Sequence, residues 1–299
     1  MRFSLRGQSE HRGRAVTDNQ SGAQSPEMLH DTARGIRADI IEMICEAGSG
    51  HPGGSLSCAD IMTALYFGGV LKHDPENPED PARDRFILAK GHAAPALYAS
   101  LANAGYFPRE ELKTLRKLGS RLQGHPDSNL LPGVEVSTGS LGQGLSIACG
   151  LACGLRLAGS ESTVFTLLGD GECQEGQVWE AAMFAAHQGL GNLIAIVDSN
   201  GLQIDGPVSD VCDPGSLADK FKAFGWKVSE VDGHSIEAVA KALTEAKGSS
   251  ASAPKAIIAK TVKGKGVSFM EGQCGWHGKA PSAEEAKLAL TELEAGKGC

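Results

Sequence analysis

The sequence has no long apolar run, no excess of positive charge and no paired cysteine motif, and each absence argues against one class of protein. No apolar stretch among its 299 residues approaches the roughly 20 residues that cross a bilayer, so no membrane span is expected. The formal net charge is −8 at pH 7, which is not the basic footprint of a nucleic-acid-binding protein. We therefore expect no nucleic acid and no membrane among its partners.

The eight cysteines form no CxxC pair. Cys149 and Cys153 lie four residues apart, but in SIACGLACG, an apolar pattern of small residues that is typical of a buried helix. Small buried cysteines explain this spacing better than a metal site does. Nothing in the sequence indicates secretion, so we expect reduced thiols and a cytoplasmic protein.

Two phosphate-binding signatures are also missing. No GxGxxG follows an expected strand and no GKS/T P-loop occurs, which argues against a plain nucleotide-binding domain. Residues 1–27 are polar and lack the apolar segment of a signal peptide. The sequence therefore predicts a disordered extension over residues 1–27, followed by one domain over residues 28–299.

Short apolar strands alternate with helical segments along the rest of the chain. The expected strands are 85–89, 163–168, 193–198, 226–231 and 256–260. The expected helices are 32–47, 59–67, 110–118, 178–188, 236–247 and 283–293. Two more are expected: one within 90–106, after a loop at the start of that segment, and one within 138–159, after a glycine-rich turn. A glycine-rich loop is expected at 48–55. This alternation predicts an α/β fold whose parallel sheet is covered by helices on both faces.

One carboxylate, Asp170, follows the apolar strand 163–168 and lies between two glycines. Gly169 and Gly171 allow the backbone to approach a ligand closely. An acid at this position could hold a hard cation. A strand-to-helix turn with Asp170 as the helix cap is the structural alternative, and this stretch alone leaves both open.

A second polar group follows the next strand, since Asn200 lies thirty residues after Asp170. If the two strands are neighbours, both side chains lie at the same edge of the sheet. Gly201 frees the backbone, so the carbonyl group of Leu202 could turn inward as a third oxygen. Mg²⁺ prefers oxygen ligands and shares its sites with phosphates, so Asp170, Asn200 and Leu202 predict a Mg²⁺–diphosphate site.

The segments GDGECQEG and DSNGLQIDG together resemble the thiamine diphosphate motif, and residues 28 to 281 resemble the N-terminal half of a transketolase. Further motifs follow in the family's order: SGHPGG (49–54), DRFILAKGHAAPALY (84–98), QGHPD (123–127), STGSLGQGLS (137–146), KTVKGKG (260–266) and WHGKAP (276–281). The resemblance implies thiamine diphosphate and Mg²⁺ as cofactors, with Ca²⁺ or Mn²⁺ able to replace Mg²⁺. It also implies transfer of a two-carbon ketol unit between sugar phosphates.

Four of the nine histidines lie in these motifs beside glycine or proline. Histidine can donate or accept at either ring nitrogen near neutral pH, which suits proton transfer on sugar hydroxyl and carbonyl groups. By resemblance, His51 and His277 serve proton transfer and the diphosphate, whereas His92 and His125 contact substrate hydroxyls. Any one of them alone would be read as a structural turn residue. The remaining histidines match no motif and are interpreted as surface or packing residues: His11, His30, His73, His187 and His234.

The resemblance also implies cofactor contacts from several other residues. The expected cofactor-binding residues are Gly139, Leu141, Asp170, Gly171, Glu175, Asn200, Ile204, Lys90 and Lys279. Gly139 and Leu141 resemble contacts to the aminopyrimidine ring, and Ile204 resembles an apolar residue packed against the cofactor rings.

Lys90 and Lys279 lie in sequence motifs that one branch of the family places near the active site. An exposed lysine, however, is usually only solvated. Glu175 matches a glutamate that links two cofactor sites across the family's dimer interface. Its structural alternative is an acid favoured at a helix N-terminus.

The family's catalytic glutamate comes from a pyrimidine-binding domain, which lies C-terminal in a full-length chain of about twice this length. The resemblance therefore implies the N-terminal subunit of a split transketolase. The expected partner is a C-terminal subunit that carries the pyrimidine-binding domain, in an α2β2 complex whose active sites form between chains. The isolated chain is then expected to be inactive.

Three alternatives remain open. The GHP motifs and WHGK argue against the α subunit of a 2-oxo acid dehydrogenase E1, and QGHPD and KGHAAP argue against a deoxyxylulose phosphate synthase. A non-catalytic paralogue is disfavoured by the intact Asp170, Asn200 and four histidines. The substrates also stay open: xylulose 5-phosphate and ribose 5-phosphate are the family's default, and a specialised transketolase would act on an unusual sugar.

Overall fold

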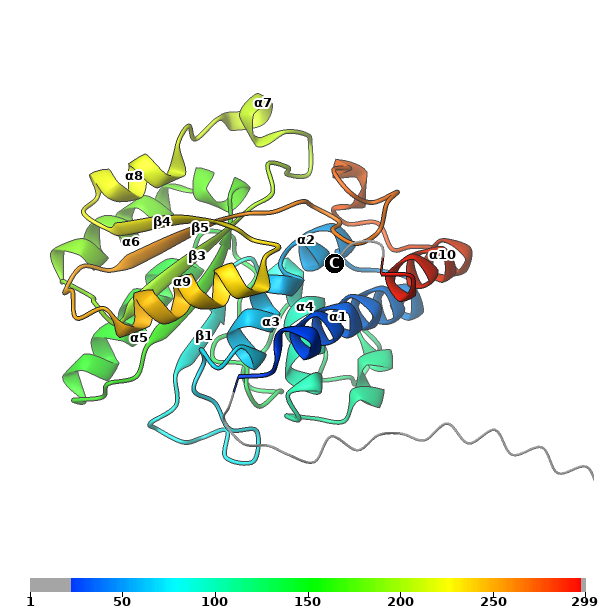
Figure 1. The fold of residues 1–299 in the computed structure, drawn as a ribbon, viewed down its shortest axis with the longest axis horizontal. Coiled ribbons are helices and arrows are strands. Elements are labelled where there is room, and N and C mark those ends of the chain that lie inside the picture. Colours follow the sequence, from blue (N-terminus) through cyan, green and yellow to red (C-terminus); the bar gives the residue numbers. More distant parts are fainter. Residues whose placement is uncertain (1–22, 297–299) are drawn as a thin grey trace, which may run out of the picture.

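The computed structural model describes residues 23–296, which form a five-stranded sheet flanked by helices (Figure 1). Every pairing in the sheet is parallel and the strand order is β1-β2-β3-β5-β4. The strands are β1 (Arg85–Leu88), β2 (Val164–Gly169), β3 (Leu193–Ser199), β4 (Lys227–Asp232) and β5 (Lys255–Lys260). Each strand begins and ends within one residue of its predicted bounds, so the predicted parallel sheet is confirmed.

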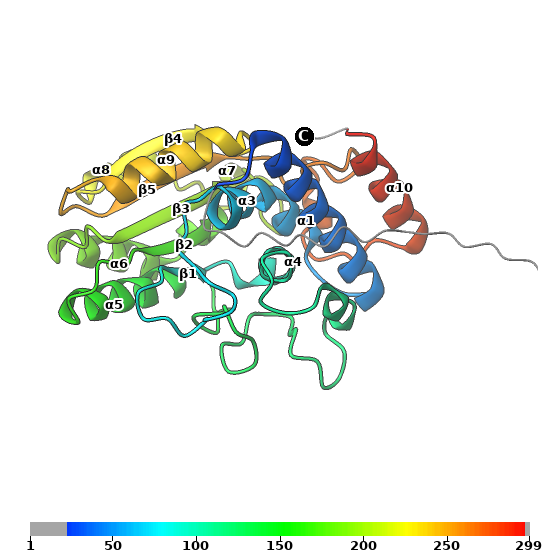
Figure 2. The same ribbon diagram turned by 60° about the horizontal axis from the view of Figure 1, so that its bottom comes forward.

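Alternate residues along the strands pack into two separate hydrophobic cores, because successive side chains of a strand point to opposite faces of the sheet. In β3, Ile194 and Ile196 pack into one core, whereas Ala195 and Val197 pack into the other. The first face is covered by α1 (Pro26–Ala47), α3 (Ala59–Phe67), α4 (Ala94–Asn103) and α9 (Ile236–Gly248). The second is covered by α5 (Gly144–Leu157), α6 (Gly176–His187) and α8 (Leu217–Ala223). Figure 2 shows the two helical layers on either side of the sheet.

Helix α1 begins six residues earlier than predicted and includes part of the segment expected to be an extension. Ser25 caps its start by accepting from the Met28 N–H at 3.4 Å, and Pro26 occupies the first turn, where its missing N–H costs nothing. The helix ends at Gly48, whose φ of 62° favours glycine. Residues 1–22 of the predicted extension lie outside the described residues.

Four short elements differ from the prediction. The glycine-rich loop 48–55 is partly helical, because Pro52 starts α2 (Pro52–Ser57). The predicted helix over 110–118 is wrong: a 3₁₀ turn, η2 (Arg109–Thr114), ends where Arg116 adopts a left-handed φ of 58°. Helices α7 (Val208–Cys212) and α8 were not predicted, because both are short and Asp213 and Pro214 separate them.

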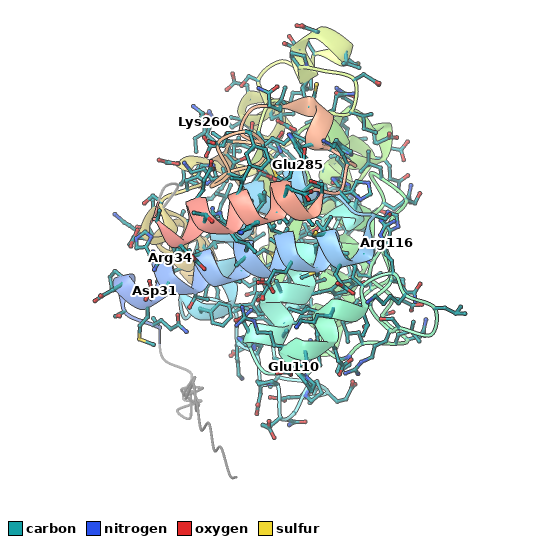
Figure 3. All side chains as sticks on the ribbon, turned by 90° about the vertical axis from the view of Figure 1, so that its right-hand side faces the viewer. Asp31, Arg34, Glu110, Arg116, Lys260 and Glu285 are labelled. Atoms are coloured by element: carbon teal, nitrogen blue, oxygen red, sulfur yellow. The ribbon has the colours of Figure 1, made fainter. Side chains whose placement is uncertain are left out.

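The remaining elements are three 3₁₀ turns and the last helix. They are η1 (Gly91–Ala93), η3 (Gly171–Gln174), η4 (Cys274–Trp276) and α10 (Ala283–Glu294). Helix α10 lies beside α1 at the opposite end of the chain (Figure 3), and Ser282 and Glu285 form a capping box at its start. Within residues 23–296, none of the helices is both long and apolar enough to cross a membrane.

Two glycines of α5 give a direct test of how closely this helix packs on the sheet. A Cβ on Gly144 would lie 2.3 Å from the Cβ of Ala89, whereas a Cβ on Gly150 would meet nothing within 4 Å. We expect Gly144→Ala to lower the free energy of unfolding by about 1–3 kcal/mol through overpacking. Gly150→Ala should instead raise it by up to about 1 kcal/mol through helix propensity. Urea unfolding of both variants measures the contrast, and a loss at Gly150 as large as that at Gly144 would contradict it.

Candidate functional site

The loops that follow four neighbouring strands meet at one edge of the sheet. Lys90 follows β1, Asp170 follows β2, Asn200 follows β3 and Thr261 follows β5. Ligands of parallel α/β sheets bind outside the carboxyl ends of the strands, so this edge is the candidate site.

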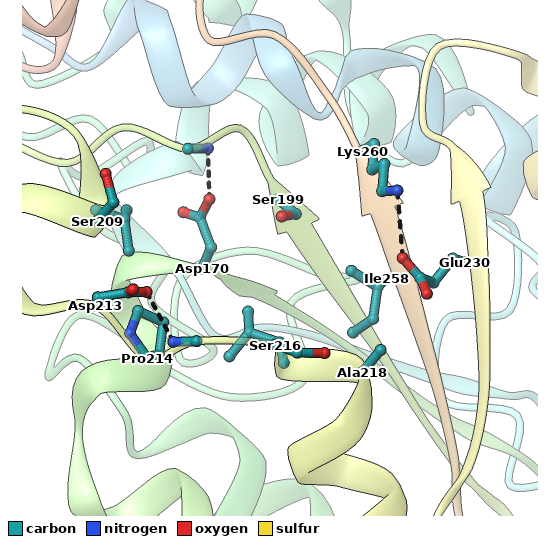
Figure 4. Close-up of a pocket in the computed structure, with 14 residues that line it drawn as sticks. Asp170, Ser199, Ser209, Asp213, Pro214, Ser216, Ala218, Glu230, Ile258 and Lys260 are labelled. Carbon is teal, nitrogen blue, oxygen red and sulfur yellow. Dashed lines mark hydrogen bonds and ion pairs between the residues drawn. The ribbon is translucent and has the colours of Figure 1, made fainter.

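Asp170 is a buried carboxylate that forms no ion pair with any residue that the structure describes, although the charge of Lys90 acts on it. Asp170 is 5% exposed, and its two oxygens accept from the N–H groups of Gly171 at 2.8 Å and Gly201 at 2.6 Å. The bond from Gly201 is drawn in Figure 4. The bond from Gly171 makes Asp170 the cap of η3, as the structural alternative expected. Burial outweighs these bonds and raises the pKa of Asp170 to about 6. A cation beside the carboxylate would offset the cost of burying its charge.

The other two predicted metal ligands lie directly beside Asp170. Gly201, with a φ of 75°, turns the backbone so that the Asn200 side-chain oxygen accepts from the Leu202 N–H at 3.0 Å. The Leu202 carbonyl oxygen points inward, where it accepts from the Lys263 ammonium at 3.3 Å. A carboxylate, an amide and a carbonyl oxygen together fit a Mg²⁺ ion whose remaining ligands are phosphate oxygens. Within residues 23–296 there is no separate group of three His, Cys, Asp or Glu side chains arranged for a metal.

A buried ion pair lies next to these ligands. The Lys90 ammonium, 2% exposed, binds the carboxylate of Asp198, which is fully buried, and donates to the Gly54 carbonyl at 2.7 Å. The hydroxyls of Ser57 and Thr261 donate to the same carboxylate. Lys90 is therefore not a solvated surface lysine. Sequence reasoning missed Asp198, although an acid that ends an apolar strand was the signal that identified Asp170.

Three of the four predicted histidines form one cluster. The ring centroids of His51 and His92 lie 5.4 Å apart, those of His51 and His277 lie 5.5 Å apart, and those of His92 and His277 lie 5.0 Å apart. Nδ1 of His51 is buried and has no hydrogen-bond partner within residues 23–296, so it is left for a ligand. His125 is exposed and lies against Gly139, where a Cβ would be 3.1 Å from its ring. A side chain at position 139 would therefore force the ring of His125 to shift.

Lys263 joins the histidine cluster to the predicted metal ligands, and sequence reasoning did not single it out. Its ammonium lies 2.8 Å from Nδ1 of His277 and 3.3 Å from the Leu202 carbonyl oxygen. The residue is 2% exposed and forms no ion pair within the described part of the chain. Burial and the nearby Lys90 charge lower the pKa of Lys263 to about 8. The only available signal was its place in the KTVKGKG motif.

The predicted cofactor-binding residues are not all brought together. Leu141 and Ile204 are 40% and 65% exposed, so their side chains are open to a ligand. Glu175 is exposed at the start of α6, whereas its neighbour Glu172 is buried and accepts from the N–H groups of Gly142 and Gly169. Burial raises the pKa of Glu172 to about 7.

Lys279 lies outside the cluster of buried site residues. Its ammonium pairs with Glu285 of α10 at 3.0 Å and lies 4.2 Å over the ring of Trp276. Of the other histidines, His30 pairs with Glu237 and His187 is exposed, which agrees with their interpretation as surface residues. His11 lies outside the described residues. The remaining two, His73 and His234, are partly buried and hydrogen-bonded.

The histidine cluster should make stability depend on pH. Burial is the main cause that lowers the pKa of His51 and of His277 to about 4, from 6.5, and that of His92 well below 6.5. The unfolded chain then binds more protons between pH 6.5 and 4, so folded-state stability falls as the pH falls through that window. We expect the melting temperature of the wild type to fall more steeply below about pH 6.5 than that of a His51→Gln/His277→Gln variant.

Calorimetry of both proteins over the same pH series measures this difference. The carboxylates with raised pKa values, Asp170 and Glu172, act in the opposite direction but are present in both proteins, so the comparison isolates the histidines. Parallel curves for the two proteins would contradict neutral, buried histidines.

Comparison with known proteins gives a consistent family. The family model "Transketolase, thiamine diphosphate binding domain" matches residues 28–295. The chain is 45% identical over 266 residues to the 6-deoxy-6-sulfo-D-fructose transketolase subunit of Clostridium sp. (strain MSTE9), covering 89% of this chain and 96% of that protein. It is 42% identical over 271 residues to an apulose-4-phosphate transketolase subunit of Actinobacillus succinogenes, covering 90% of this chain and 97% of that protein.

Longer relatives match over part of their length. Homo sapiens transketolase is 43% identical over 271 residues, which are 90% of this chain but 42% of that protein. The transketolase structure from Campylobacter jejuni superposes with a TM-score of 0.84 at 36% identity, covering 91% of this chain and 43% of that one. The fold, the motifs and these matches agree: the chain belongs to the transketolase family and corresponds to its thiamine diphosphate-binding domain.

Proposed function

We propose that this chain is the N-terminal subunit of a two-chain transketolase, which transfers a two-carbon ketol unit from a ketose phosphate to an aldose phosphate. The observation that carries the proposal is the buried carboxylate of Asp170, which forms no ion pair within the described residues and lies next to Asn200 and the Leu202 carbonyl. The relatives named as transketolase subunits match over almost their whole length, which supports a two-chain enzyme.

The proposed cofactor site uses the residues that meet at the sheet edge. Asp170, Asn200 and the Leu202 carbonyl bind Mg²⁺, which Ca²⁺ or Mn²⁺ can replace, and diphosphate oxygens complete the coordination. Gly171 keeps the backbone close to the phosphate groups, and Lys263 supplies a buried positive charge on the same side. Thiamine diphosphate, when bound, supplies carbanion stabilisation.

The histidines provide the proposed acid–base chemistry. His51, His92 and His277 are held neutral by burial at neutral pH, so each has one ring nitrogen that can accept a proton from a sugar hydroxyl and one ring N–H that can donate a hydrogen bond. His125 is exposed beside them and would contact the substrate from the open side of the site. Gly139, Leu141 and Ile204 would contact the cofactor rings.

The partner is proposed to be a C-terminal subunit that supplies the pyrimidine-binding domain in an α2β2 complex. Four exposed apolar side chains on α5 and α6 are available for contacts between subunits. They are Ile147, Leu157, Met183 and Phe184, which are between 36% and 87% exposed. Glu175, exposed at the start of α6, is placed to take part in such an interface. Lys90 binds Asp198 and the Gly54 carbonyl, so we assign it to support of the site, whereas Lys279 pairs with Glu285 near the surface.

The test is to co-express the chain with the protein encoded beside it and to assay ketol transfer from xylulose 5-phosphate to ribose 5-phosphate, with thiamine diphosphate and Mg²⁺. The chain alone is the control. Further arms replace the donor with 6-deoxy-6-sulfofructose, with an apulose phosphate or with a 2-oxo acid. Activity with a sugar donor in the pair but not in the single chain is the expected result.

Three outcomes would contradict the proposal. Ketol transfer by the chain alone would exclude a shared active site. Turnover of the 2-oxo acid alone would indicate a related dehydrogenase subunit. Tight Mg²⁺-dependent cofactor binding by the pair with no turnover of any donor would indicate a non-catalytic paralogue.

A further inference from the structure

His234, which matches no recognised motif, connects the core of the protein to the segment that carries Lys263. It lies in the turn between β4 and α9, and its side chain is 15% exposed. Nδ1 lies 2.8 Å from the carboxylate of Asp60, and Nε2 lies 2.8 Å from the backbone N–H of Val262. A backbone N–H can only donate, so Nε2 must accept and Nδ1 must carry the proton that binds Asp60. One neutral tautomer therefore satisfies both contacts.

Asp60 is itself fixed from the opposite side. Arg37 of α1, 1% exposed, forms an ion pair with the Asp60 carboxylate of α3, which is also buried. The Arg37 Nε group donates to the Lys265 carbonyl at 3.2 Å. The ion pair thus holds the segment 262–265 at two points, Val262 through His234 and Lys265 directly.

Lys263 lies between these two points. A further bond, from the Gly264 N–H to the Gly53 carbonyl at 3.0 Å, ties the same segment to α2. With its backbone held on both sides, the Lys263 side chain extends to Nδ1 of His277 and to the Leu202 carbonyl. Among the described residues, His234 itself forms no hydrogen bond with a residue of the candidate site.

We propose that His234 is a positioning residue: by accepting from the Val262 N–H it holds the segment 262–265 so that the Lys263 ammonium lies between His277 and the Leu202 carbonyl. The role rests on the proposed function, because it acts on the site that we assign to the metal and the diphosphate. Removal of the His234 imidazole should weaken cofactor binding because the Lys263 ammonium is displaced, and not because the whole protein becomes less stable.

The experiment compares three variants in the two-chain complex: His234→Ala, His234→Gln and, as matched control, His73→Ala. The glutamine amide can donate to Asp60 and accept from Val262, so it should restore most of the tie. His73 is also partly buried and bonded at both nitrogens, to the Tyr66 carbonyl at 3.0 Å and the Tyr106 hydroxyl at 3.3 Å, but its partners lie outside the candidate site. Titration calorimetry gives the dissociation constant of thiamine diphosphate with Mg²⁺, and thermal unfolding gives the stability.

We expect His234→Ala to weaken cofactor binding by about 10- to 100-fold, as removal of a supporting residue behind a metal site does. His234→Gln should recover most of the affinity, and His73→Ala should lower the melting temperature without changing the affinity. In a double-mutant cycle, His234→Ala should add little to the effect of Lys263→Met. Equal affinities for the two alanine variants, or full additivity with Lys263→Met, would overturn the proposal.

Hydrogen exchange separates this proposal from the proposed function. If the wild-type complex binds no thiamine diphosphate, the proposed function fails, but the tie is still tested by exchange of the Val262 amide in the cofactor-free chain. That amide should lose protection in His234→Ala and keep it in His234→Gln. Unchanged protection in His234→Ala would overturn the tie whatever the cofactor does.

Discussion

Asp170→Asn is expected to abolish Mg²⁺-dependent binding of thiamine diphosphate while leaving the fold intact. The substitution removes the only charged oxygen ligand of the proposed metal site, and removing one partner of a buried charge pair costs about 3–5 kcal/mol. That cost corresponds to a loss of affinity of at least about 100-fold. The chain without cofactor should still fold, because the carboxylate forms no ion pair with the described residues. The amide can keep one of the two bonds from the Gly171 and Gly201 N–H groups, and the loss of the other should cost about 1–3 kcal/mol. Calorimetric titration with and without Mg²⁺ measures the affinity, and thermal unfolding measures the fold.

Asp213→Asn is the matched control for this experiment. Asp213 lines the same cavity of about 320 Å³ as Asp170 and also accepts from a backbone N–H, that of Gly215 at 2.8 Å, but it is exposed (Figure 4). Its loss should leave the cofactor affinity unchanged. If both variants lost affinity equally, the effect would come from the charge of the cavity, and the metal site at Asp170 would be excluded.

Lys90→Met is expected to cause the largest loss of stability of any single change in the site. It leaves the fully buried carboxylate of Asp198 without its cation, and the remaining donors, Ser57 and Thr261, are neutral hydroxyls. A buried charge left without its partner costs about 3–5 kcal/mol, a large part of the stability of a typical domain. Urea unfolding of the variant and the wild type measures the loss.

Two further variants separate the buried pair from a simple loss of charge. Lys90→Met/Asp198→Asn removes both charges and should be more stable than Lys90→Met alone. Lys117→Met breaks an exposed pair with Glu46, whose side chains are about half exposed, and should leave stability close to that of the wild type. If Lys90→Met unfolded at the same urea concentration as Lys117→Met, the buried pair would contribute nothing.

The strands and the ends at which ligands bind could be predicted because they depend on local pattern. Short apolar runs gave all five strands, and an acid or amide directly after a run identified Asp170 and Asn200. Glycine content misled the prediction at α2, since Gly53 and Gly54 read as a loop. Glycine is favoured at these two positions because neighbouring atoms lie close. A Cβ on Gly53 would lie 2.9 Å from the Trp276 carbonyl oxygen, and one on Gly54 would lie 3.2 Å from Nε2 of His92.

Contacts between distant segments could not be predicted from pattern. Lys90 and Lys279 both follow the family's wording, yet the structure buries Lys90 against Asp198 and pairs Lys279 with Glu285 near the surface. Lys263 and His234 acquire their contacts only when the segment after β5 meets α2, α3 and the turn after β4. Nothing within a few residues of either one indicates those partners.

The position of β5 has a consequence for synthesis of the chain. This strand is the last of the five in sequence, yet it lies between β3 and β4 and pairs with both. During synthesis, the edges of β3 and β4 that pair with β5 therefore remain unpaired until residues beyond 255 have left the ribosome. Exposed strand edges of this kind are prone to aggregation. A nascent chain that stalls after α9 would hold Asp170 and Asn200 but neither Lys263 nor His277, so the proposed cofactor site is complete only in a nearly complete subunit.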